Sequence, residues 1–247
     1  MKLSFLPLLQ IQRDLYAMPR GMERFREYIK TMTDPETGDL ALPLVAMNPM
    51  GKDHIPALIE EYIGLGAEHI ASDAIDGIRR GDQPADRDYK VALVVSDDLK
   101  GGWTNRWASE FSHRLESAAF LKRGFITALL WTSEPATASR VRDAVLTSIH
   151  RAAYLQAHPA PKTLRGMLEQ EGYAMARAGC TTPALDADDL AYTRAVIEPH
   201  LDAHDRATVI ACLFGDAAAT ALGYPPQGLS GRAGLALALS EARAFAR

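Results

Sequence analysis

An uninterrupted apolar run at residues 91–95 constrains the fold of this chain more than any other feature. The run contains three valines and stops at Ser96, Asp97 and Asp98. Strands in which apolar and polar residues do not alternate are buried on both faces, as in a parallel sheet covered by helices. A second such run occupies residues 125–131. We therefore expect two strands of a parallel sheet.

The segment between the two runs predicts the helix that a parallel connection needs. Large apolar residues recur every four positions from Trp103 to Leu115, as on one side of a helix over residues 103–118. We assign this stripe to the core. After the second strand, Ser133 is a good N-cap residue, so the next helix is expected to start there.

Three further segments complete the N-terminal part. Residues 42–47 are a weaker strand candidate, followed by a turn and a helix that Asp53 would cap. The apolar stretch at residues 3–9 is broken by Pro7, and no cleavage pattern follows it, so we expect a packed segment and not a signal peptide. Residues 67–78 predict another helix.

The last hundred residues are rich in alanine and almost without strand signals. We expect a helix-rich α/β fold with a small, mostly parallel sheet of three to four strands flanked by helices and an all-helical C-terminal portion. The chain is expected to form a single domain over 1–247, with an α/β core at 1–158 and a helical cover or interface at 159–247. The expected C-terminal helices are 163–178, 188–197 and 229–246, with 208–213 ambiguous between helix and strand.

Composition excludes several classes of partner. Hydrophobic residues make up 47% and charged residues 23% of the chain, as in a folded globular protein. A net charge of −4 without basic clusters argues against nucleic-acid binding. No apolar stretch is long enough for a membrane span. Cys180 and Cys212 lack a CxxC spacing and are expected to be reduced and packed, which favours the cytoplasm.

Polar residues gather where the expected strands end. In open parallel sheets, ligands bind at the carboxyl ends of the strands, where loops lead into helix N-termini. We therefore expect a ligand site at three junctions. Its candidate residues are Asn48, Lys52, Asp53 and His54 at the first junction, Asp97, Asp98, Lys100, Gly101, Gly102, Asn105 and Arg106 at the second, and Thr132, Ser133 and Glu134 at the third.

These residue types predict an enzyme of unassigned chemistry that acts on a small anionic molecule, phosphorylated or carboxylated. His54, Asp97 and Asp98 are the candidates for acid–base work or for holding a metal. Lysine and arginine side chains and the amides of the paired glycines would hold the anion. Neither a metal nor a cofactor is identified. The simpler interpretation is that the aspartates cap turns and the glycines let the chain reverse.

Other metal-like spacings are better explained by surface chemistry. Glu110 and His113 form an ExxH pair, but Arg106 and Arg114 lie one turn away on either side, which is typical of an exposed salt-bridged stripe. His69 and Asp73, and the pair His200 and His204, are likewise interpreted as solvated polar surface.

A second class of function stays open beside the enzyme. Small residues recur from Gly231 to Ala242 and would let a helix approach another copy of the chain closely. The alternative is therefore a non-catalytic, homo-oligomeric binding or scaffold protein that associates through residues 229–246.

Overall fold

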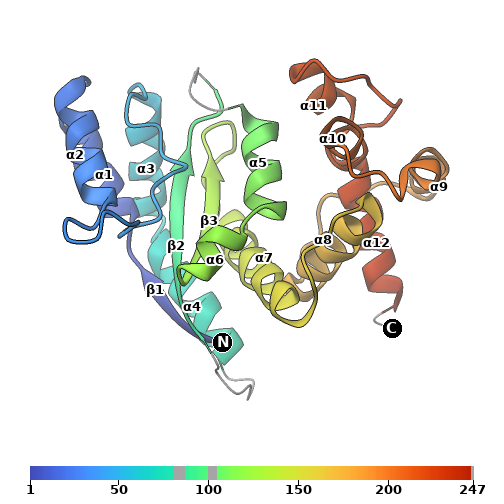
Figure 1. Ribbon diagram of the computed structural model, residues 1–247, viewed down its shortest axis with the longest axis horizontal. Coiled ribbons are helices and arrows are strands. Elements are labelled where there is room, and N and C mark those ends of the chain that lie inside the picture. Colours follow the sequence, from blue (N-terminus) through green and yellow to red (C-terminus); the bar gives the residue numbers. More distant parts are fainter. Residues whose placement is uncertain (80–86, 100–104, 246–247) are drawn as a thin grey trace. The chain divides into compact units, whose positions relative to one another are not determined.

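The computed structural model describes residues 1–79, 87–99 and 105–245 (Figure 1). They divide into two compact units. Unit 1 contains Met1–Arg106 and Ser117–Ser148, and unit 2 contains Trp107–Glu116 and Ile149–Arg247. The single-domain organisation stays a prediction, and each unit is described by itself.

Unit 1 is built on a parallel sheet of three strands in the order β1-β2-β3. Its strands are β1 (Lys2–Leu6), β2 (Asp88–Ser96) and β3 (Phe125–Trp131). The apolar run at 91–95 lies in the central strand and is fully buried, as its composition predicts. The expectation of a helix-rich α/β fold with a small parallel sheet and a helical C-terminal region is confirmed.

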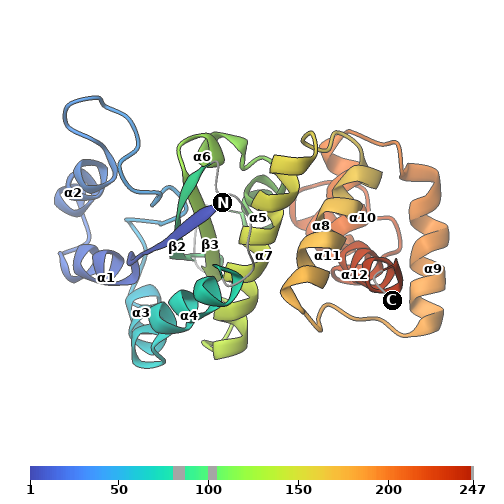
Figure 2. The same ribbon diagram turned by 90° about the horizontal axis from the view of Figure 1, so that it is seen from below.

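Helices cover both faces of this sheet. α1 and α3 lie on one face and α7 on the other (Figures 1 and 2), and α1 packs against both α3 and β2. The helices of this unit are α1 (Leu9–Ala17), α2 (Met22–Met32), α3 (His54–Gly64), α4 (Ala67–Arg79), α6 (Ala118–Lys122) and the first part of α7 (Ala138–Ala157), which continues into unit 2.

The strand expected at residues 42–47 is wrong. This segment forms turns, with the Leu44 amide bonded to the Leu42 carbonyl at 2.9 Å, although Leu44 and Met47 are fully buried. Leu44 and Met47 are buried within a loop, whereas Val45 is 48% exposed, and Pro43 has no N–H to offer a sheet. The edge strand beside β2 is instead β1, formed by the N-terminal apolar stretch.

The helix boundaries near the site also differ from expectation. The described part of the 103–118 segment forms α5 (Arg106–Leu115), and Trp103 lies outside the described residues. α7 begins at Ala138 and not at Ser133, because the Thr137 hydroxyl accepts a hydrogen bond from the Arg140 amide at 3.3 Å. The Ser133 side chain is therefore available for another role.

Unit 2 consists of helices in the described part of the chain, and the ambiguous segment 208–213 is helical. α12 packs against α8, α9 and α10. A Cβ at Gly172 would lie 2.5 Å from the Ala238 carbonyl oxygen, so α8 and α12 need a glycine where they cross. The elements are α5 from Trp107 onward, the rest of α7, α8 (Leu164–Ala178), α9 (Ala187–Ile197), η1 (Glu198–His200), α10 (Arg206–Phe214), α11 (Asp216–Ala221) and α12 (Ala233–Phe245).

A buried ionic cluster ties the helices of unit 2 together. Glu171 is 0% exposed, and its carboxylate accepts hydrogen bonds from Arg151 at 2.6 and 2.9 Å and from Arg114 at 2.5 Å. Glu110 is also buried, and it is paired with Arg114 and bidentately with Arg232. The prediction of an exposed stripe around Glu110 is wrong, because Arg232 arrives from a distant part of the chain.

Among the described helices, none combines the length and the apolar character needed to span a bilayer.

Candidate functional site

The carboxyl ends of β2 and β3 bring together polar side chains from four segments of unit 1. Ser96 pairs with Trp131 in the register, so the two strands end at the same level. The site is formed by His54 at the start of α3, Asp97 and Asp98 after β2, Arg106 at the start of α5, and Thr132, Ser133 and Glu134 after β3.

His54 and Asp97 form a close pair. The His54 Nε2 atom lies 2.8 Å from Asp97 Oδ1, and the side chains are 17% and 1% exposed. Asp97 Oδ1 also accepts hydrogen bonds from the Leu99 amide at 3.2 Å and from the Thr132 hydroxyl at 3.0 Å. His54 Nδ1 is buried and has no hydrogen-bond partner among the described residues. One ring nitrogen is therefore held by a carboxylate, and the other makes no hydrogen bond to the described residues.

The loop before α3 fixes the position of His54. The Asp53 side chain makes no capping hydrogen bond, so the cap predicted there is wrong. The loop is held instead by Tyr16, whose hydroxyl donates to the Asn48 carbonyl at 2.7 Å, and by Arg24, which donates to the carbonyls of Pro49 and Gly51. The sequence signals only a turn here and does not show these distant supports.

Asn48 serves this loop directly. Its side chain is buried, and its Oδ1 accepts the Met50 amide at 3.1 Å, as in an Asx turn. Burial and the negative charge of Asp97 raise the pKa of Tyr16 above its ordinary value, with Arg24 opposing. Tyr16 therefore stays protonated and continues to donate to the loop.

Gln12 holds the end of β2 in place. Its side-chain amide donates to the Val95 carbonyl at 3.1 Å and accepts from the Val95 amide at 2.9 Å. β1 pairs with β2 only as far as Ala92, so the buried amide continues the hydrogen bonding of the sheet beyond β1. The strand end that carries Asp97 is thus supported on both sides. No sequence pattern identifies Gln12 for this role.

Asp98 is the centre of a second, ionic part of the site. It accepts hydrogen bonds from the Ser133 amide at 2.8 Å, the Ser133 hydroxyl at 2.6 Å and Arg106 Nη1 at 2.7 Å. Burial acts to raise the pKa of Asp98, but the bonds from Ser133 and Arg106 outweigh it and hold the pKa below its usual value. Asp98 is therefore an ionised, fully engaged carboxylate.

Arg106 bridges Asp98 to Glu134. Its Nη2 donates to Glu134 Oε1 at 2.8 Å, and its guanidinium lies 4.2 Å from the centroid of the Trp131 ring. Glu134 is also paired with Arg140 at 2.6 Å. Two carboxylates and two guanidinium groups thus compensate each other, and Arg106 already contacts protein anions.

Thr132 links the two parts of the site. Its hydroxyl oxygen lies 3.0 Å from Asp97 Oδ1 and 3.0 Å from Asp98 Oδ1, and it accepts the Asp98 amide at 3.0 Å. A hydroxyl has a single proton, so Thr132 donates to one carboxylate at a time. Its place beside Ser133 at the third junction is the sequence signal for this role.

The remaining candidate residues contribute less to this geometry. Lys52 and Asn105 are exposed. Lys100, Gly101 and Gly102 lie outside the described residues.

Two further buried hydroxyls, those of Tyr62 and Ser96, were not among the site candidates from the sequence. Neither hydroxyl has a hydrogen-bond partner in the described part of the chain. Burial, followed by the charge of Glu134, raises the pKa of Tyr62 to about 12, with Arg140 opposing. The Tyr62 phenol is therefore protonated at neutral pH.

The described residues contain neither a metal-binding cluster nor an activated thiol. No group of three or more histidine, cysteine, aspartate or glutamate side chains within 1–79, 87–99 and 105–245 is arranged to hold a metal ion. His69 and Asp73 lie 3.1 Å apart on exposed surface. Burial, followed by the charge of Asp205, raises the pKa of Cys212 to about 11, which is not that of an activated nucleophile.

Comparison of the chain with protein-family models, with curated proteins and with solved structures gave no match.

Proposed function

We propose that this protein is an enzyme in which His54 and Asp97 transfer a proton to or from a small molecule bound at the carboxyl ends of β2 and β3. The observation that carries the proposal is the His54 ring itself. Its Nε2 lies 2.8 Å from Asp97 Oδ1, and its buried Nδ1 has no partner among the described residues. A buried nitrogen without a partner is costly to the fold, which supports a functional role.

The contacts of Asp97 indicate which nitrogen of the His54 ring carries the proton. Its Oδ1 accepts from a backbone amide and a threonine hydroxyl, which favours the ionised carboxylate. An ionised Asp97 requires His54 Nε2 to be the protonated nitrogen, so the lone pair of the neutral ring lies on Nδ1. Nδ1 is then the general base. When Nδ1 accepts a proton, Asp97 stabilises the imidazolium that forms, as in Asp–His catalytic pairs.

The proposed substrate is a small anionic molecule, but Arg106 is no longer among the residues proposed to bind it. Arg106 is bonded to Asp98 and Glu134, so we assign it to positioning the loops after β2 and β3. We assign anion binding to Lys52, whose side chain is exposed, and to Lys100, which lies outside the described residues. Metal assistance has no support from a ligand cluster in the described residues.

The small residues that suggested the non-catalytic, homo-oligomeric alternative have another explanation within unit 2. The small residues of α12 that suggested a contact between copies pack inside unit 2: Ala238 lies against Gly172 of α8, and Gly234 against Cys212 of α10. These contacts account for the small residues without a second copy.

A panel of phosphorylated and carboxylated small molecules, read by mass spectrometry, tests the proposal. Wild-type protein should turn over at least one compound, and His54→Gln and Asp97→Asn should each lower the rate by about 10²–10⁴-fold, the usual contribution of a general base. His69→Gln on the exposed face of α4 is the matched control and should retain the full rate. Equal rates in His54→Gln and wild type, or no turnover of any compound, would contradict the proposal.

A further inference from the structure

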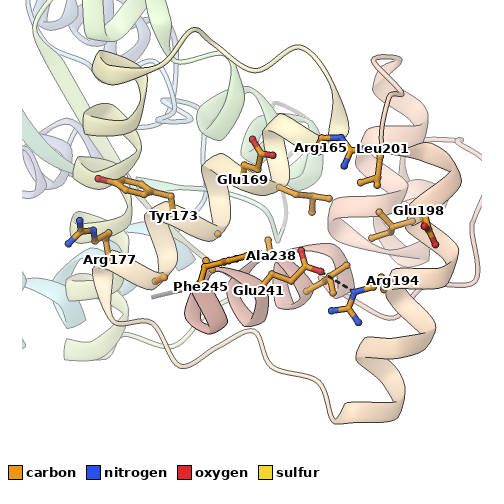
Figure 3. Close-up of a pocket in the computed structure, with 16 residues that line it drawn as sticks. Arg165, Glu169, Tyr173, Arg177, Arg194, Glu198, Leu201, Ala238, Glu241 and Phe245 are labelled. Atoms are coloured by element: carbon orange, nitrogen blue, oxygen red, sulfur yellow. Dashed lines mark hydrogen bonds and ion pairs between the residues drawn. The ribbon is translucent and has the colours of Figure 1, made fainter. Parts of the chain in front are cut away.

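Unit 2 contains a pocket that shares no residue with the His54 site. Its volume is about 620 Å³, within the range of small-molecule sites (Figure 3). The pocket lies among α8, α9 and α12. Its lining residues are Arg165, Leu168, Glu169, Gly172, Tyr173, Ala176, Arg177, Arg194, Ile197, Glu198, Leu201, Leu237, Ala238, Glu241, Ala242 and Phe245.

The packing of α12 explains why the space is open. α12 packs against both α8 and α9, and it approaches α8 closely at Gly172. The side chains that α12 presents to the space include Ala238 and Ala242, which are too small to fill it. A pocket therefore remains between α8 and α9, with α12 as its floor (Figure 3).

The pocket is elongated, and apolar side chains and the carboxylate of Glu169 lie along its middle (Figure 3). Its lining residues on α8 recur three or four positions apart from Arg165 to Arg177, which corresponds to about 18 Å at ~1.5 Å rise per residue. Leu168, Ile197 and Leu237 supply apolar surface between these ends. An occupant that gains from this shape has an extended apolar chain.

Charge is distributed unevenly between the ends. In Figure 3, Arg165 shares its end with Glu198, and Arg194 is paired with Glu241 at 3.1 Å. Arg177 lies at the other end beside Tyr173, with its guanidinium 5.7 Å from the centroid of that ring. Neither Arg177 nor Arg165 forms an ion pair with a carboxylate within the described residues, but Glu198 lies at the end of Arg165 and no carboxylate is labelled at the end of Arg177 (Figure 3). An anionic group fits this end best.

We infer that this pocket binds a free amphiphile whose apolar chain lies between α8 and α9 and whose anionic head group contacts Arg177. This is a binding function in addition to the proposed proton-transfer site. The two are separable, because His54→Gln should leave amphiphile binding unchanged.

Calorimetry on the full chain with three probes of equal chain length tests the head group. The probes are dodecanoate, dodecanol and dodecylamine, each below its micelle concentration. Dodecanoate should bind at least about tenfold more tightly than the other two. Arg177→Gln should remove this preference, whereas Arg165→Gln, which neutralises the opposite end, should retain it. Equal or tighter binding of dodecylamine would contradict the assignment of the head group.

Pocket-filling variants test the location. Ala176→Leu and Ala242→Leu each place a larger side chain in the pocket and should abolish dodecanoate binding, with unchanged circular dichroism as the check on folding. Ala217→Leu, on the exposed side of α11, is the matched control and should bind like wild type. Methyl NMR should show dodecanoate-dependent shifts at Leu237 and Ala238.

Three results would overturn the inference. These are the absence of dodecanoate binding to wild type, undiminished binding to both pocket-filling variants, and association with vesicles of an anionic phospholipid without binding of monomeric dodecanoate. The last result would identify a membrane surface as the occupant in place of a free amphiphile.

Discussion

Buried charges in the two units differ in how completely they are paired. In unit 2, both oxygens of the buried Glu171 carboxylate accept hydrogen bonds from guanidinium groups. In unit 1, His54 is bonded to Asp97 through one ring nitrogen, and the other is buried without a partner among the described residues. A fully paired buried cluster stabilises a fold, whereas an unpaired group leaves a bond for a ligand to make.

Removing the charge of Glu171 should have the largest effect on stability. Glu171→Gln leaves Arg151 and Arg114 buried with too few acceptors, and we expect the free energy of unfolding to fall by about 3–5 kcal/mol. Urea denaturation measures this change. Glu169→Gln, exposed on the same helix, is the control and should change stability by less than ~0.5 kcal/mol. Similar losses in both variants would refute the role of the cluster.

Acid should act through the same carboxylate. Burial alone would raise the pKa of Glu171, but Arg151 and Arg114 lower it to about 2 from an ordinary value of 4.5. Because the folded-state pKa is the lower one, this contribution is complete above pH ~4.5 and is lost as the pH falls towards ~2. Glu171→Gln should lack this part of the acid dependence.

The pH dependence of unit 2 should also extend nearer to neutrality through His113. Burial, followed by the charges of Arg151 and Arg114, lowers the pKa of His113 to about 3 from 6.5, with Glu110 and Glu171 opposing. The folded state binds the proton less readily, so stability should decline as the pH falls from ~6.5 towards ~3. His113→Gln should flatten the stability profile in this window. An unchanged slope in thermal unfolding would contradict the prediction.

The strands and the location of the site could be predicted from the sequence because both follow from local pattern. The apolar runs of β2 and β3 require burial on both faces, and parallel strands end at one edge, so Asp97 and Thr132 had to meet. The apolar loop containing Pro43 was predicted to be a strand because burial was inferred without the backbone partners that define a sheet.

What could not be predicted depends on contacts between distant residues. Glu110 and Arg114 have the spacing of an exposed helical pair, but Glu110 is buried and also binds Arg232, 122 positions later in the chain. The Gln12 side chain bonds the backbone of Val95, 83 positions later, where a neighbouring strand would otherwise pair. No periodicity within a short window contains either contact.

Two buried tyrosines test the same contrast between paired and unpaired buried groups, with smaller expected effects. Tyr16→Phe removes a 2.7 Å hydrogen bond to the Asn48 carbonyl and should cost about 1 kcal/mol. Tyr62→Phe removes a hydroxyl without a partner in the described part of the chain and should be neutral or slightly stabilising. Chemical denaturation of both variants distinguishes the two cases. A loss at Tyr62 equal to that at Tyr16 would show that the Tyr62 hydroxyl is bonded in solution.

The change in stability expected at His54 is also small. His54→Gln removes a side chain that is incompletely paired, so the free energy of unfolding should change by less than ~1 kcal/mol while turnover is lost. Denaturation and rate measurements on the same preparation give this comparison. A loss of stability as large as that of Glu171→Gln would show that His54 serves to stabilise the fold.

The protonation of the His54 ring tests the central claim most directly. Long-range ¹H–¹⁵N NMR on imidazole-labelled protein reports which nitrogen of the neutral ring carries the proton. The account predicts a proton on Nε2 and a lone pair on Nδ1, with the tautomer preference weakened in Asp97→Asn. A neutral ring protonated on Nδ1 would contradict the assignment of this atom as the general base.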